Sequence, residues 1–109
     1  MTRREILMDR YANIDRNILP PRITDTPEDC IKHGDSKIVT ARQHIKRKNY
    51  VMAGNSFVTA IIQFKTARLC ELKRINESNY ASLFRLKVIN ELIDYATKGY
   101  RITLPYIVD

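Results

Sequence analysis

The chain is poor in the residues and patterns that mark several functional classes. Only three of its 109 residues are glycine, and it has no glycine-rich loop of the kind that holds nucleotide phosphates. It has no internal repeat, and no apolar run approaches the roughly 18 residues needed to span a membrane. The N-terminus, MTRREILMDRY, has no long apolar stretch behind its arginines. We therefore expect no secretory signal, no membrane association and a cytoplasmic protein, or a nuclear one in a eukaryote.

Cysteine is also scarce, and the usual catalytic patterns are missing. Cys30 and Cys70 are the only cysteines, and without an export signal we expect reduced thiols. Cys30 and His33 have the spacing of half a zinc site, but a structural site needs two such pairs. The pair Glu71 and Lys73 resembles the end of a nuclease motif, yet it falls in a helical pattern. We expect a binding protein without cofactor or metal, and not an enzyme.

Acidic residues are nearly absent from the middle third of the chain. Residues 36–74 contain nine lysines and arginines and a single acid, Glu71, whereas the remainder holds ten basic and eleven acidic residues. The formal net charge of +7 is therefore concentrated in this basic segment. A concentrated field of one sign attracts a partner of the opposite sign.

What is present predicts a mainly α fold, a single compact domain of four to five helices over residues 1–109. Apolar residues recur at helical spacing along most of the chain. Thr2 and Thr26 are expected to cap helices, and Pro27 suits a first helical position. Glycines are expected at helix ends or breaks. The predicted helices span residues 3–17, 27–34, about 36–45, 57–75 and 80–99, with loops at 18–26, 49–56 and 76–79.

Two parts of this pattern carry specific expectations about the core and the tail. The first half of the helix at 57–75 is apolar nearly all round, so it is expected at the centre, and Ile61 and Leu83 are predicted core residues. Residues 100–109 alternate apolar and polar side chains, which predicts a C-terminal extended arm or edge strand. Two such tails would pair as a homodimer, or the tail would pack on its own helices as an irregular arm.

The stretch ARQHIKRKNY at residues 41–50 is the centre of the candidate binding site. It combines four positive charges with side chains that form hydrogen bonds or stack, and it contains no acid. Lysines and arginines at this density favour contact with phosphates. If the two helices that carry them pack antiparallel, their basic faces are expected to merge into one strip. The candidate residues are Lys37, Arg42, Gln43, His44, Lys46, Arg47, Lys48, Asn49, Tyr50, Lys65, Arg68, Lys73 and Arg74.

These residues predict a small nucleic-acid-binding protein that holds DNA or RNA mainly through phosphate contacts. The sequence contains no evident base-reading helix, so modest sequence preference is expected. The composition also fits an accessory protein of a virus or mobile element. The alternative function is an adaptor or inhibitor that docks on an acidic surface of a larger protein, and a solvated basic face is the structural alternative.

Overall fold

The chain folds into helices that begin largely where the sequence places caps. A computed structural model describes residues 1–18, 26–74 and 80–108, and none of them forms a β-strand. Thr2 Oγ1 accepts a hydrogen bond from the Glu5 amide at 3.1 Å, and Thr26 Oγ1 accepts one from the Asp29 amide at 3.2 Å. The elements are α1 (Arg3–Ala12), α2 (Ile14–Asn17), α3 (Pro27–Lys46), α4 (Tyr50–Arg74), α5 (Tyr80–Thr103) and the 3₁₀-helix η2 (Leu104–Tyr106).

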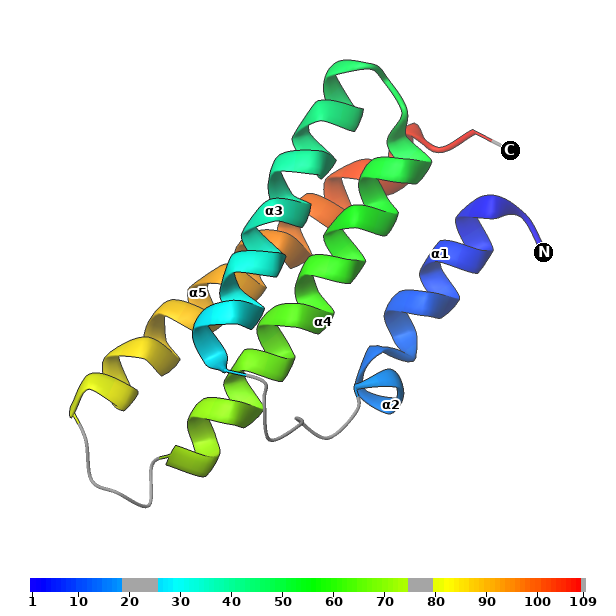
Figure 1. The fold of residues 1–109 in the computed structure, drawn as a ribbon. Coiled ribbons are helices and arrows are strands. Elements are labelled where there is room, and N and C mark those ends of the chain that lie inside the picture. The colour runs from blue at the N-terminus through cyan, green and yellow to red at the C-terminus, as the bar shows by residue number, and fades with distance from the viewer. Residues whose placement is uncertain (19–25, 75–79, 109) are drawn as a thin grey trace.

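Helix α4 is the centre of the molecule, as its apolar composition predicts. Helices α3 and α5 both run along it, and α1 and α2 pack on a further side (Figure 1). Its buried side chains form the largest part of the core: Phe57, Val58, Ala60, Ile61, Phe64 and Ala67. The result is an elongated bundle of 49 × 26 × 20 Å, mainly helical and compact, as predicted. None of the helices in the described ranges is both long enough and apolar enough to cross a membrane.

The three glycines correct the predicted helix boundaries. Gly34, Gly54 and Gly99 lie inside α3, α4 and α5, so the predicted stops at these positions are wrong. Each glycine stands where another side chain presses against the helix backbone. A Cβ atom would lie 2.3 Å from Phe64 at Gly34, 2.5 Å from Leu7 at Gly54 and 2.4 Å from Phe57 at Gly99. The absence of a side chain here permits close packing of helices and does not end them.

The connection between α3 and α4 is three residues long, so the predicted break at 49–56 is also wrong. Lys48 adopts a left-handed conformation with φ of 59°. Its amide donates to the Ile45 carbonyl at 2.9 Å, and the Asn49 amide donates to the His44 carbonyl at 2.9 Å. This pair of bonds is the Schellman arrangement that ends a helix, with lysine where glycine is usual. Asn49 Oδ1 then accepts from the Met52 amide and caps α4.

Residues 100–108, the described part of the C-terminal segment, contain no strand, which corrects the predicted extended arm. Helix α5 continues to Thr103, and η2 follows it directly. Tyr100, Thr103 and Ile107 are buried at spacings of three and four, and the Tyr100 ring stacks on Tyr11 with centroids 4.3 Å apart. The apparent alternation arises because Ile102 lies on the exposed side of α5. Backbone groups that belong to a helix are not available for strand pairing, so the expected route to a homodimer is absent.

A half-buried arginine links helix α1 to α4 by hydrogen bonds. The Arg10 guanidinium donates to the Asn55 carbonyl oxygen and to Thr59 Oγ1, each at 2.9 Å. Burial lowers the pKa of Arg10 below its ordinary value. The predicted helix over 3–17 is interrupted at Asn13, whose side chain donates to the Asp9 carbonyl. The predicted loops at 18–26 and 76–79 fall almost wholly outside the described residues.

Candidate nucleic-acid interface

Four exposed cations surround the connection between α3 and α4. Arg42 and Lys46 lie one turn apart near the end of α3, and Arg47 and Lys48 form the connection itself. We call these four residues the basic turn. Gln43 and Asn49 are also exposed beside them. The structure therefore brings together six of the predicted site residues at one end of the bundle.

The single acid of the basic segment is removed from the surface. Glu71 is fully buried at the interface of α4 and α5. Arg85 Nε donates to one of its carboxylate oxygens, and Ser82 Oγ donates to the other at 3.3 Å. Arg85 also lies 3.8 Å from Glu28 on α3, so the three helices are joined at this end. Every exposed charged side chain described between residues 36 and 73 is therefore positive.

Arg42 is positioned by a residue of α5. Its Nε donates to the Tyr95 hydroxyl at 3.0 Å, its Nη2 donates to the same oxygen, and its guanidinium carbon lies 5.3 Å from the centre of that ring. The contact joins α3 to α5 across α4. Arg42 remains exposed, so a phosphate would meet a guanidinium whose orientation is already fixed.

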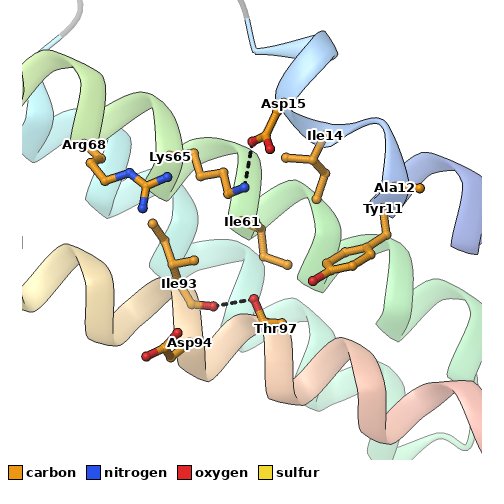
Figure 2. Close-up of a pocket in the computed structure, with 10 residues that line it drawn as sticks. All are labelled: Tyr11, Ala12, Ile14, Asp15, Ile61, Lys65, Arg68, Ile93, Asp94 and Thr97. Carbon is orange, nitrogen blue, oxygen red and sulfur yellow. Dashed lines mark hydrogen bonds and ion pairs between the residues drawn. The ribbon is translucent and has the colours of Figure 1, made fainter.

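Lys65 and Arg68 lie in a different place and have partners of their own. They line a pocket of about 430 Å³ among α1, α2, α4 and α5. Figure 2 shows Lys65 reaching Asp15 on α2, with 2.7 Å between Nζ and Oδ1. Arg68 donates to Asn90 Oδ1 at 3.2 Å. The hydrogen bond from Lys65 is the main reason that the pKa of Asp15 is below its ordinary value.

Antiparallel packing of α3 and α4 separates these cations from the basic turn. Lys65 lies about 22 Å along the axis of α4 from Tyr50, and Lys73 lies about 34 Å along it. Lys73 is exposed near the far end of α4, and the side chain of Arg74 is outside the described residues. Lys37 is exposed in the middle of α3. The two basic faces therefore do not form the single strip expected from the sequence.

His44 and Tyr50 take structural positions next to the basic turn. The His44 carbonyl accepts hydrogen bonds from the backbone of Arg47 and Asn49, and its side chain is half-buried. The ring of Tyr50 stacks on Tyr106 with centroids 4.8 Å apart, so one of its faces is already covered. These contacts fix the end of α3 and the start of α4.

The two residues of the predicted half zinc site, Cys30 and His33, lie in different surroundings. Cys30 is buried in α3 while His33 is exposed on it. Within the described ranges, no three histidine, cysteine or acidic side chains are grouped so as to hold a metal ion. The chain matches no protein-family model, no curated protein and no solved structure.

Sequence reasoning missed Arg85, which pairs with the buried Glu71, and Tyr95, which orients Arg42. Their partners are 14 and 53 residues away in the sequence, beyond the range of any helical spacing rule. One signal was present, because an acid alone among cations and within a strongly apolar helix pattern suggests a buried ion pair.

Proposed function

We propose that this protein binds nucleic acid through phosphate contacts made by the basic turn. The observation that carries the proposal is the distribution of charge along residues 36–73, where all exposed charged side chains are positive and the one acid is buried. An exposed group of lysines and arginines free of acids is the electrostatic footprint of a phosphate-binding surface.

The backbone at the basic turn supports the same function. The first amides of α4 point out of its N-terminus, where a helix favours anions. The last carbonyls of α3 lie at the same end and would repel a phosphate. The backbone amides of residues 47–49 donate to three of these carbonyls, those of Gln43, His44 and Ile45. A phosphate near Tyr50 would therefore meet the side chains of Lys46, Arg47 and Lys48 and those first amides of α4 that Asn49 does not cap, since Asn49 Oδ1 already accepts from the Met52 amide.

Charge reversal at the basic turn tests the proposal. Binding of the full chain to fluorescent duplex DNA and to single-stranded DNA and RNA of random sequence is measured by anisotropy at several salt concentrations. Contact with about three or four phosphates predicts a slope of log K against log salt near −3 to −4 on duplex DNA. The double variant Arg47→Glu, Lys48→Glu should weaken binding at least about tenfold.

A matched control separates a local site from a general charge effect. Lys32→Glu, Lys87→Glu makes the same change in net charge at two exposed positions on α3 and α5. It should weaken binding by a much smaller factor. Equal losses in the two variants, or tight binding with a slope near zero, would overturn the proposal. If no nucleic acid binds, an acidic protein surface is the remaining partner expected for the same residues.

A further inference from the structure

Helix α5 has a second face, turned away from α4, that carries several exposed apolar side chains. Its inner face is buried against α4, with Ile89, Ile93 and Ala96 among its members. On the outer side, Phe84 is 69% exposed, Tyr95 44% and Ile102 61%, and Val88 is half-buried. At 3.6 residues per turn these four side chains lie within about 40° of one another around the helix. We call them the outer stripe.

The positions on the outer side of α5 map onto one another when the helix is reversed about the level of Ile93, although the residue types at mirrored positions differ. Phe84 and Ile102 are equally far from Ile93 along the helix, and the intermediate positions on this face are Glu91 and Lys98. Val88 and Lys98 are equally far from Ile93 along the helix, and so are Glu91 and Tyr95. This spacing is common to all α-helix faces, so whether two reversed copies fit depends on which side chains meet. We propose that two copies of this chain associate through the outer side of α5, antiparallel about a twofold axis that crosses this side at the level of Ile93 along the helix.

Each mirrored pair makes a favourable contact in this arrangement. Phe84 meets the partner's Ile102, which buries two of the most exposed apolar side chains on the helix. The aliphatic part of Lys98 lies over the partner's Val88 and leaves its ammonium in water.

The third pair, Tyr95 and the partner's Glu91, is polar. It would use the hydroxyl proton of Tyr95 as a hydrogen-bond donor. The Tyr95 hydroxyl accepts both of its hydrogen bonds from Arg42, so its own proton remains to be donated. The carboxylate of the partner's Glu91 would accept that proton beside the Arg42 guanidinium. Within the described residues, Glu91 and Lys98 have no ion pair or hydrogen bond of their own. Their charges are therefore available to a second copy.

The size of the contact sets the expected affinity. Helix α5 is about 36 Å long, and one helix face of that length is smaller than a standard protein interface of about 800 Å² per partner. We therefore expect a reversible dimer with a micromolar dissociation constant. The inference uses residues of α5 and Arg42, and it does not depend on nucleic-acid binding.

Sedimentation equilibrium of the full chain, from about 5 to about 500 µM, tests the dimer and its geometry. Phe84→Glu and Ile102→Lys should each raise the dimer dissociation constant at least about tenfold. A mixture of the two variants should recover dimer, because the new glutamate of one chain meets the new lysine of the other. The two positions are about 27 Å apart within one chain and cannot pair internally.

The neighbouring residue Leu83 supplies a matched control. It is 56% exposed but lies on another side of α5, so Leu83→Glu should leave the dissociation constant unchanged. Circular dichroism of all three variants should show native helix, since each position is exposed. A parent chain that stays monomeric at the highest concentration overturns the proposal. So does a dimer that Phe84→Glu leaves intact, or single variants that fail to recover dimer when mixed.

Discussion

At the scale of single residues, helix packing depends on positions where a side chain is absent. Gly34 allows the fully buried ring of Phe64 to lie directly on the backbone of α3, and Gly99 does the same for Phe57 on α5. Glycine inside a helix costs about 1 kcal/mol relative to alanine. The close approach of two helices offsets this cost because it allows dense packing of the aromatic ring.

Gly34→Ala should therefore destabilise the protein, although alanine is the better helix former. The new Cβ would lie 2.3 Å from the ring of Phe64, which is fully buried in the core. We expect a loss of about 1–3 kcal/mol in the free energy of unfolding, measured by urea denaturation. Ser36→Ala, at an exposed position two residues away, is the control and should not destabilise.

A second variant tests the stated cause. Phe64→Leu in the Gly34→Ala background removes ring atoms that would clash, so the double variant should lose less stability than the sum of the two single changes. Strict additivity of the two changes would contradict the packing argument.

Lys48 is the one non-glycine residue with a positive φ among the described residues. Its φ of 59° costs a residue with a Cβ atom roughly 1 kcal/mol relative to glycine. Lys48→Gly should therefore raise the free energy of unfolding by about 1 kcal/mol. Lys48→Ala removes the same charge but keeps the Cβ atom, so it should give no such gain. Equal stabilities for the two variants would show that the backbone is not strained here.

At the scale of elements, one buried ion pair joins α4 to α5 and reaches α3. Glu71 is buried with Arg85 as its cationic partner, and Arg85 extends to Glu28 at 3.8 Å. A buried carboxylate is tolerated only with such a partner, because desolvation of a charge is costly. The contact therefore fixes how the ends of α4 and α5 meet.

Arg85→Met should destabilise the protein by about 3–5 kcal/mol, because it leaves the Glu71 carboxylate buried without a cation. Thermal and urea unfolding measure the loss. Adding Glu71→Gln to the same chain removes the unpaired charge, so the double variant should be more stable than Arg85→Met alone. A double variant that is less stable than Arg85→Met would exclude the buried charge as the cause.

At the scale of the whole molecule, burial is decided by how the other helices surround α4. Ile61 is 1% exposed at the centre of the bundle. Leu83, on the apolar stripe read from the sequence, is 56% exposed, so its predicted place in the core is wrong. The buried face of α5 instead carries Ser82, Ile89 and Ile93. The hydrogen bond to Glu71 satisfies the hydroxyl of Ser82 and so allows this polar residue to be buried.

Alanine at these two positions should have very different effects on stability. Ile61→Ala leaves a cavity in a densely packed core and should cost about 2–5 kcal/mol. Leu83→Ala should change the free energy of unfolding by about 0.5 kcal/mol or less, as at other exposed positions. Urea denaturation of the two variants and the parent measures both changes in the free energy of unfolding. The dependence of that free energy on urea concentration is compared among the three proteins. A loss above about 2 kcal/mol for Leu83→Ala would contradict the burial seen in the structure.

The amino-acid sequence by itself determined the helical class, the threonine caps, the central place of α4 and the concentration of positive charge. These features depend on contacts within a turn or two of helix or on composition. Tertiary structure decided whether the glycines end helices, how far α5 extends, and where the basic residues lie. The reason is physical: Gly34 meets Phe64, Gly99 meets Phe57, and Arg42 meets Tyr95 only after the helices pack. Contacts between residues so far apart in the chain leave no periodic signal in the sequence.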